Sequence, residues 1–378
     1  MPIVAFMSSA EHSISEILNK RESQGALRKL FISGKAVDFC SNDYLGFSRS
    51  SILAASIEER IKQEGITNGS AGSRLLAGNS VFAERLETFL AAKHKAPAAL
   101  VFNSGYDANV GLFSSVPQRG DTILYDELVH ASIHDGIRLS RADSFSFRHN
   151  DKAHLKERLE KARGNIFIAV ESVYSMDGDI SPLKQIAEIC SDHNANLIVD
   201  EAHATGVFGY GLVQQLNLQG KVFARVHTFG KAMGCHGAVV LGGNVLKQYL
   251  INYARSFIYT TALPLHSLVS IMCSYELMES DKSAAEKLHE NITYFRDKTK
   301  GHSNWMDSTS AIQGLVMPGN DKIKQIAAAI QSQDIDARAI LSPTVAKGRE
   351  RIRVCLHAFN TKKEMDLLLK VTEEELKK

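Results

Sequence analysis

The feature that most constrains the fold is a series of five short apolar runs in the first two thirds of the chain. Each is almost continuously apolar, contains β-branched residues and spans at most seven positions, which is typical of strands covered on both faces of a parallel sheet. Most are separated by ten or more residues with helical periodicity, such as 79–95. The pattern predicts an α/β fold with a mostly parallel sheet. The five runs are 98–102, 122–125, 165–171, 196–200 and 237–243.

The pattern changes after Pro264. A long helical stretch, 265–300, leads to the apolar segment 311–318, a helix near 321–332, a strand candidate at 351–359 and a closing helix from Thr361. We therefore predict a large domain over residues 45–264 and a smaller α+β domain over 265–378. Residues 1–44 are expected to form an N-terminal segment that packs with the small domain.

Charge and cysteine content exclude several classes of protein. The 378 residues carry 44 basic and 42 acidic side chains, a net charge of +2, which gives no electrostatic footprint for nucleic acid or an anionic membrane. The five cysteines are scattered, without CxxC spacing or a disulfide framework. The first dozen residues lack the basic and apolar regions of a signal peptide, and no run of 18 apolar residues occurs. These features predict a cytoplasmic protein.

The stretch "LIVDEAHATGVFG" places Asp200 at the end of a predicted strand. Ligands of open parallel sheets bind outside the carboxyl ends of the strands, so we expect the Asp200 carboxylate to face a site. Asp-Glu-Ala-His is also a box of ATP-driven helicases, which need a GxxxxGK[ST] phosphate loop. The Gly-Lys pairs at 34–35, 220–221 and 230–231 are not followed by Ser or Thr. An ATPase or a binding module stays an alternative that the sequence disfavours.

Lys231 follows Asp200 by 31 residues. Asp200, His203 and Lys231, in "TFGK", together resemble the pyridoxal-phosphate (PLP) enzymes of the aspartate-aminotransferase fold, fold type I. In such enzymes a lysine carries the cofactor, a carboxylate pairs with the pyridinium nitrogen, and anion donors hold the phosphate. The phosphate could lie on "NSGYDANVG", where Gly105 and Tyr106 open a helix after a strand, with Thr228 as a second donor.

Nine motifs in order and spacing resemble the α-oxoamine synthases. This family condenses an amino acid with an acyl thioester, carried by CoA or a carrier protein, with loss of CO₂. The wording of "SNDYLGF", "YSMDGD" and "TFGKAMGCHGAVVLG" is most similar to the member that uses L-alanine and a pimeloyl thioester in biotin biosynthesis. Family members that use glycine or serine, and other PLP reactions on the same fold, remain alternatives. The nine motifs are "SNDYLGF", "GSAGSRLLAGN", "FNSGYDAN", "DELVHASIHDG", "ESVYSMDGD", "DEAHATGVFG", "TFGKAMG", "FIYTTALP" and "SPTVAKGRERIRV".

The resemblance implies roles for the catalytic and cofactor-binding residues. Lys231 would carry PLP and act as the acid and base, and Asp200 would pair with the pyridine nitrogen. His203 would bond the ring hydroxyl, and His130 would stack on the ring. The other implied cofactor contacts are Ser175, Gly105, Tyr106 and Thr228, together with Thr260 or Thr261 as a phosphate donor from the neighbouring subunit. The last of these implies a homodimer with shared active sites.

The resemblance also implies which residues bind the substrate. Arg353, the second arginine of "RIR", would clamp the amino-acid carboxylate, a task suited to a planar bidentate donor. Asn42 would lie beside it. Arg74 is a further expected substrate contact, with a structural role as its alternative.

Three features stand apart from these assignments. His130 and His134, four residues apart, could instead bind a metal, but no third ligand stands nearby in the sequence, so no metal is expected. Ala71 replaces a glycine that is common in the family, which we expect to require a negative φ at this position. Leu341 and Ser342 stand where the pimeloyl enzyme is expected to carry Arg-Pro, which bears on the acyl pocket.

Overall fold

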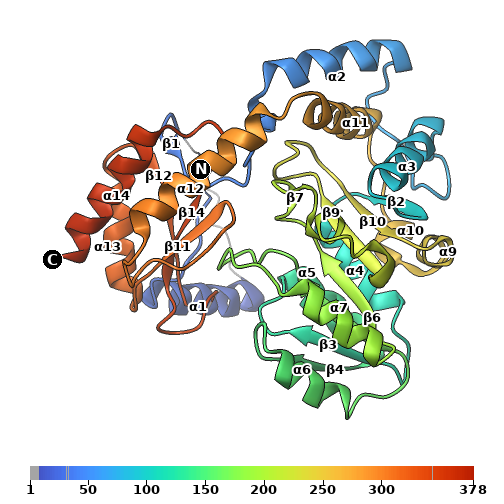
Figure 1. Ribbon diagram of the computed structural model, residues 1–378, viewed down its shortest axis with the longest axis horizontal. Helices are drawn as coiled ribbons and strands as arrows, with labels where there is room; N and C mark the ends of the chain where they lie inside the picture. Colours follow the sequence, from blue (N-terminus) through green and yellow to red (C-terminus); the bar gives the residue numbers. More distant parts are fainter. Residues whose placement is uncertain (1–7, 31, 33, 343) are drawn as a thin grey trace.

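A seven-stranded sheet forms the centre of the larger part of the molecule in this computed structural model (Figure 1). The structure describes residues 8–30, 32, 34–342 and 344–378. Only β10 runs antiparallel to its neighbours in this sheet, so the α/β fold with a mostly parallel sheet is confirmed. In sheet order the strands are β2 (Ala98–Phe102), β10 (Ala238–Gly242), β9 (Ala224–Thr228), β6 (Asn196–Asp200), β5 (Ile166–Glu171), β3 (Thr122–Asp126) and β4 (Asp143–Phe147).

The five apolar runs correspond to five of these strands, whereas β4 and β9 carry no such run. β4 is an edge strand with an alternating sequence, "DSFSF". β9 contains Arg225 and His227, which break the apolar pattern but are buried. Arg225 Nη2 donates to the carbonyl of His94 over 2.8 Å. Buried polar side chains with tertiary partners therefore concealed a central strand from pattern analysis.

Helices cover both faces of the sheet, as the nearly continuous apolar strands require. α4 and α5 pack together against one face with α9, where Ile198 and Val226 join their core. α6 and α7 cover the opposite face, where Val199 and Leu197 are buried. The helices of this part are α2 (Ser51–Glu64), α3 (Val81–Lys93), α4 (Gly105–Ser115), α5 (Ala131–Leu139), α6 (Lys152–Leu159), α7 (Leu183–Asp192), α8 (Leu212–Gln215), α9 (Asn244–Tyr253) and α10 (Arg255–Ile258).

The smaller part, at the left in Figure 1, is built mainly from the carboxyl-terminal elements of the chain and contains a three-stranded antiparallel sheet in the order β11-β14-β13. The N-terminal segment joins it, because β1 pairs in parallel with β12. Its elements are β1 (Val37–Asp38), β11 (Ile312–Val316), β12 (Ile335–Asp336), β13 (Arg338–Ile340), β14 (Arg351–Cys355), α12 (Ser283–Thr299), α13 (Asn320–Gln331) and α14 (Lys362–Leu376).

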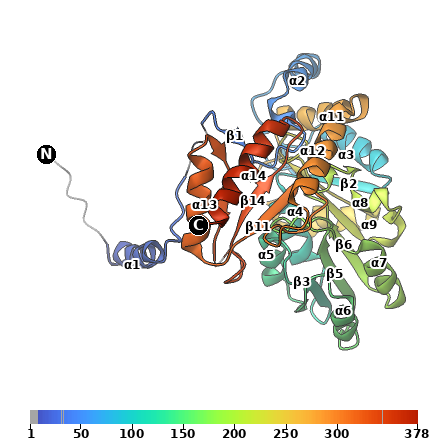
Figure 2. The same ribbon diagram turned by 60° about the vertical axis from the view of Figure 1, so that its left-hand side comes forward.

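The long helical stretch after Pro264 is divided between two helices. α11 (Leu265–Ser280) packs against α2 and α3, whereas α12 packs against α14 of the smaller part. The predicted domain boundaries at residues 44 and 264 stay a prediction. Helix α1 (Ser9–Ser23) buries none of its residues and projects from the body of the molecule in Figure 2. In the described part of the chain, no helix has the length and apolar character required to cross a membrane.

The expectation for Ala71 is wrong. Its φ is +54°, in the left-handed region, where the Cβ of an L-residue crowds the following carbonyl at a cost of roughly 1–2 kcal/mol. The loop accepts this strain because the adjacent Gly72 is held by tertiary contact, its carbonyl accepting a hydrogen bond of 2.9 Å from the amide of Ala262. Backbone conformation at this position is thus set by the docking of the loop, which the sequence does not reveal.

Candidate active site

Two carboxyl groups lie at the ends of neighbouring strands. Glu171 ends β5 and pairs in register with Asp200, which ends β6. Both side chains point to the face covered by α4, where the Asn109 amide donates to Asp200 Oδ2 over 2.7 Å. The amide of Ala202 donates to the other oxygen, Oδ1. Burial, and next the charge of Asp200, raise the pKa of Glu171 well above its usual value. Two donors therefore fix the Asp200 side chain, beside an acid whose neutral form is favoured by burial.

Lys231 lies on the loop that joins β9 to β10 and reaches the same edge of the sheet. Its Nζ lies 2.8 Å from Nε2 of His203. Burial lowers the pKa of His203 well below its usual value, and the nearby Lys231 charge lowers it further. Burial also lowers the pKa of Lys231, to about 8, against the opposing effects of Asp200 and Glu171. A neutral imidazole thus accepts from an amine that loses its proton readily.

A hydrogen-bond chain connects this histidine to the smaller part. The hydroxyl of Tyr44 lies 2.8 Å from His203 Nδ1 and donates to Asn42 Oδ1 over 3.0 Å. Asn42 Oδ1 also accepts from Arg353 Nη2 over 3.0 Å, and Arg353 Nε donates to the carbonyl of Ser175 over 2.6 Å. The predicted substrate residues Asn42 and Arg353 are thus brought together, within two side chains of Lys231.

The first turn of α4 and the end of β9 form a site suited to an anion. Ser104 caps α4 by accepting from the amide of Asp107, which leaves other amides of the turn without helical partners. A Cβ at Gly105 would lie 3.3 Å from Cβ of Thr228, so a side chain at this position would crowd the threonine. Glycine therefore keeps the space between the helix terminus and Thr228 open.

His130 and Tyr106 lie at the amino-terminal ends of two adjoining helices, α5 and α4. His130 precedes α5, and its Nδ1 lies 3.2 Å from the amide of Ser132, which donates to it. Burial lowers the pKa of His130, and Asp200 opposes this effect. His130 nevertheless keeps exposed surface, as stacking requires. The Tyr106 hydroxyl donates to Asp135, so this side chain has a protein partner of its own.

Three further predicted contacts, Thr260, Thr261 and Arg74, have partners outside the hydrogen-bond chain of Lys231. The Asn103 amide donates to Thr260 Oγ1 over 2.9 Å and to the carbonyl of Thr261 over 2.8 Å. Arg74 pairs with the buried Glu87 over 2.9 Å. In this single chain Arg74 therefore has a structural partner, and the contribution of these three residues to substrate or cofactor stays a prediction.

Three residues of the site escaped the sequence assignments although all lie in quoted motifs. Asn109 is in "FNSGYDAN", Glu171 opens "ESVYSMDGD", and Tyr44 is in "SNDYLGF". Each is buried. The sequence offered one signal for them: each is a polar residue within a motif, at a position that the helix or strand pattern directs inward.

Comparison with known proteins identifies the class of protein that has this arrangement. The model of the family "Aminotransferase class I and II" matches residues 34–371. The chain belongs to this family.

Individual relatives and solved structures are similar to this chain over most of its length. 8-Amino-7-oxononanoate synthase of Emericella nidulans is 46% identical over 385 residues, which cover 94% of this chain and 93% of the relative. The enzyme of the same name from Lysinibacillus sphaericus is 36% identical, covering 92% and 94%. The solved 8-amino-7-oxononanoate synthase of Francisella tularensis is 28% identical with a TM-score of 0.78, covering 90% and 98%. Serine palmitoyltransferase of Sphingomonas wittichii has the same fold, with a TM-score of 0.88 at 23% identity over 99% and 98%.

Proposed function

We propose that this protein is a PLP-dependent acyltransferase with 8-amino-7-oxononanoate synthase activity. It condenses a small amino acid, L-alanine in preference, with an acyl thioester, pimeloyl in preference, and releases CO₂ and an α-amino ketone for biotin biosynthesis. The observation that carries the proposal is the contact between Lys231 Nζ and neutral His203, next to an Asp200 carboxylate held by Asn109. The relatives named 8-amino-7-oxononanoate synthase support it.

The site residues fit PLP in charge and in shape. PLP supplies an electron sink for the negative charge that develops at the amino-acid α-carbon. Lys231 would hold it covalently, Asp200 would hold the proton on the ring nitrogen, and His203 would bond the ring hydroxyl. The open α4 terminus at Gly105, with Thr228, would hold the phosphate.

The chain's own groups also explain how the amino acid would be oriented and deprotonated. Arg353 and Asn42 would bind its carboxylate and fix the torsion about the α-carbon. Lys231, once free, would take the α-proton at Nζ, because a pKa of about 8 leaves part of the amine unprotonated near neutral pH. His130 would cover one face of the site.

We further propose that the enzyme acts as a cytoplasmic homodimer with shared active sites. Large apolar side chains are exposed close to the predicted phosphate donors: Leu76 is 86% exposed, Val81 84% and Tyr259 72%. A neighbouring subunit that covered these side chains would remove their apolar surface from water. Thr260 lies next to Tyr259, and its hydroxyl would donate to the cofactor phosphate in the active site of the neighbouring subunit.

Glycine or serine chemistry is the second candidate, as in 2-amino-3-ketobutyrate CoA ligase or serine palmitoyltransferase. Leu341 bears on the acyl chain, because this residue is half-buried against apolar neighbours and gives the terminal carboxylate of a pimeloyl chain no charge partner.

A panel assay of the dimeric holoenzyme separates these candidates. L-alanine, glycine and serine are each combined with pimeloyl, octanoyl and acetyl thioesters, and kcat/KM is measured from thiol release. The proposal predicts alanine with pimeloyl as the preferred pair. Preference for octanoyl would assign Leu341 to an apolar acyl pocket, and a ten-fold preference, about 1.4 kcal/mol, for glycine with acetyl would replace the proposed substrates.

A further inference from the structure

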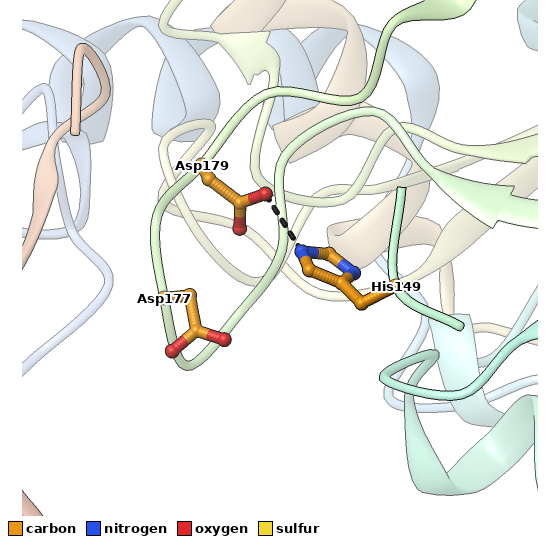
Figure 3. Close-up of side chains that lie close together, drawn as sticks. All are labelled: His149, Asp177 and Asp179. Carbon is orange, nitrogen blue, oxygen red and sulfur yellow. Dashed lines mark hydrogen bonds and ion pairs between the residues drawn. The ribbon is translucent and has the colours of Figure 1, made fainter. Parts of the chain in front are cut away.

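A charged cluster connects the sheet to a neighbouring loop outside the Lys231 site. His149 follows β4, and its Nδ1 lies 2.9 Å from Asp126 Oδ1 at the end of β3. Its Nε2 lies 2.8 Å from Asp179 Oδ2 (Figure 3). The Asn150 amide donates to the same Asp179 oxygen over 2.7 Å. The histidine therefore bridges two carboxylates that belong to separate elements.

Asp179 belongs to a folded loop, residues 173–180, that lies between the two parts of the molecule. The loop is closed at its base by the pairing of Val173 with Ile180 and internally by the amide of Gly178, which donates to the Tyr174 carbonyl over 2.8 Å. The His149 ring packs edge-on against the Tyr174 ring, with centroids 4.4 Å apart. On the sheet side, His149 thus contacts the 173–180 loop by charge and by packing.

The other side of the 173–180 loop contacts the smaller part. The carbonyl of Ser175 accepts from Arg353 Nε over 2.6 Å, and Arg351 forms an ion pair with Asp177. Ser308 Oγ donates to the Gly178 carbonyl over 2.8 Å. Replacing Gly178 would place a Cβ 2.2 Å from the carbonyl oxygen of Ile312, so the loop is in close contact with β11.

We propose that His149 is a positioning residue for substrate binding: by holding Asp179 and Asp126 it fixes the 173–180 loop, whose Ser175 carbonyl orients Arg353 toward the amino-acid carboxylate. This inference rests on the proposed role of Arg353. The Arg353 guanidinium donates from Nε to the loop, from Nη2 to Asn42 and from Nη1 to Cys355 Sγ. A shift of the Ser175 carbonyl therefore changes the plane in which the remaining donors meet a carboxylate.

A protonated His149 explains the arrangement of these carboxylates better than a bound metal ion does. His149, Asp177 and Asp179 present ligand atoms within 4.8 Å of one another. However, Asp177 is neutralised by Arg351, and Asp179 already accepts from the Asn150 amide. The imidazolium ring offers one N–H to Asp126 and the other to Oδ2 of Asp179, so both ring nitrogens have a carboxylate partner.

The charge of His149 makes the effect dependent on pH. Burial acts to lower the pKa of His149, but the hydrogen bonds and charges of Asp126 and Asp179 outweigh it and raise the pKa to about 9. Since the folded pKa lies above the ordinary value of about 6.5, the contribution of the imidazolium is complete below that pH and is lost as the pH rises through 9. The other titratable or charged groups facing the cluster are Asp177, Glu127, Tyr174 and Arg351.

The test compares His149→Gln and Asp179→Asn with His154→Gln in the PLP-loaded dimer. His154 is a matched control because it lies in the same region and accepts from the Arg148 amide, with no contact to the 173–180 loop among its hydrogen bonds. The dissociation constant of L-alanine, or of glycine or serine where these are preferred, is measured from the change in the cofactor spectrum. Hydrogen exchange of residues 173–180 is measured on the same samples.

We expect the two cluster variants to bind the amino acid about ten-fold more weakly at pH 7, comparable to the loss on removing a residue that orients a metal ligand. The ratio of the dissociation constant of His149→Gln to that of wild type should fall toward one above pH 10. Hydrogen exchange of residues 173–180 should be faster in the two cluster variants, and His154→Gln should match wild type in both measurements. Unchanged affinity in folded His149→Gln, or a ratio that does not vary with pH, overturns the inference. A wild-type enzyme that binds no small amino acid contradicts the proposed function instead, and unchanged loop exchange in His149→Gln then refutes the positioning role independently.

Discussion

The side-chain amide of Asn109 donates a 2.7 Å hydrogen bond to Oδ2 of Asp200, and both residues are buried. This contact fixes the rotation of the carboxylate that we assign to the cofactor ring nitrogen. The backbone amide of Ala202 fixes the other oxygen. Asp200 is thus preorganised before any ligand arrives, because helix α4 and the turn after β6 each supply one donor.

Replacement of Asn109 by Ala should destabilise the protein by about 1–3 kcal/mol, because a buried carboxylate oxygen loses its donor. Asn109→Asp should weaken PLP binding further, since it places a second negative charge against Asp200. Urea unfolding and cofactor titration measure the two effects. Ser132→Ala is the control, as it removes the other acceptor of the Asn109 amide without touching Asp200. Equal losses in Asn109→Ala and Ser132→Ala would contradict the assignment.

Asp200→Asn and Glu171→Gln form a matched pair at the ends of adjacent strands. Asp200→Asn should keep most of its PLP yet slow exchange of the alanine α-proton by roughly 100-fold, because a neutral partner no longer holds the ring proton. Glu171→Gln should change exchange little, since burial raises the pKa of Glu171 and favours the neutral form, which glutamine resembles. NMR in D₂O measures the exchange. Normal exchange in Asp200→Asn would refute its role.

The stability of the cofactor-free protein should depend on pH because of the lowered pKa of Lys231. The pKa of Lys231 is lowered to about 8 by burial, below the usual value of about 10.4, so the unfolded chain binds more protons between these values and stability rises with pH. Cofactor-free Lys231→Met should therefore exceed wild type in stability at pH 7, with an advantage that shrinks between pH 8 and 10.5. Denaturant unfolding across this range provides the measurement, and an advantage that stays constant would show that Lys231 is not perturbed.

The sequence located the parts of the site that depend on position along the chain. Asp200 and Lys231 follow strands, and the carboxyl ends of parallel strands share one edge of the sheet, so their proximity was predictable. Contacts between distant side chains were not. Arg74 has a polar motif around it, but its partner, the buried Glu87, is visible only in the folded structure. Likewise, nothing in "AVESVYSM" reveals that the Ser175 carbonyl meets an arginine 178 residues further on.

Backbone strain at Ala71 offers a test of local geometry. Because its φ of +54° suits glycine, Ala71→Gly should stabilise the protein by about 1 kcal/mol. Ala55→Gly, at an exposed position within α2, should instead destabilise it by about 1 kcal/mol. Thermal unfolding of both variants provides the comparison. Destabilisation by both substitutions would mean that residue 71 has a negative φ.

Release of CO₂ from L-alanine labelled in its carboxyl carbon tests the central claim most directly. The wild-type holoenzyme should release labelled CO₂ only when pimeloyl thioester is present, in equal amount to free thiol, because decarboxylation follows carbon–carbon bond formation. Lys231→Ala should fold and release none. Labelled pyruvate in place of CO₂, or CO₂ release that does not depend on any acyl thioester, would contradict the account and assign the Lys231 site to a different reaction.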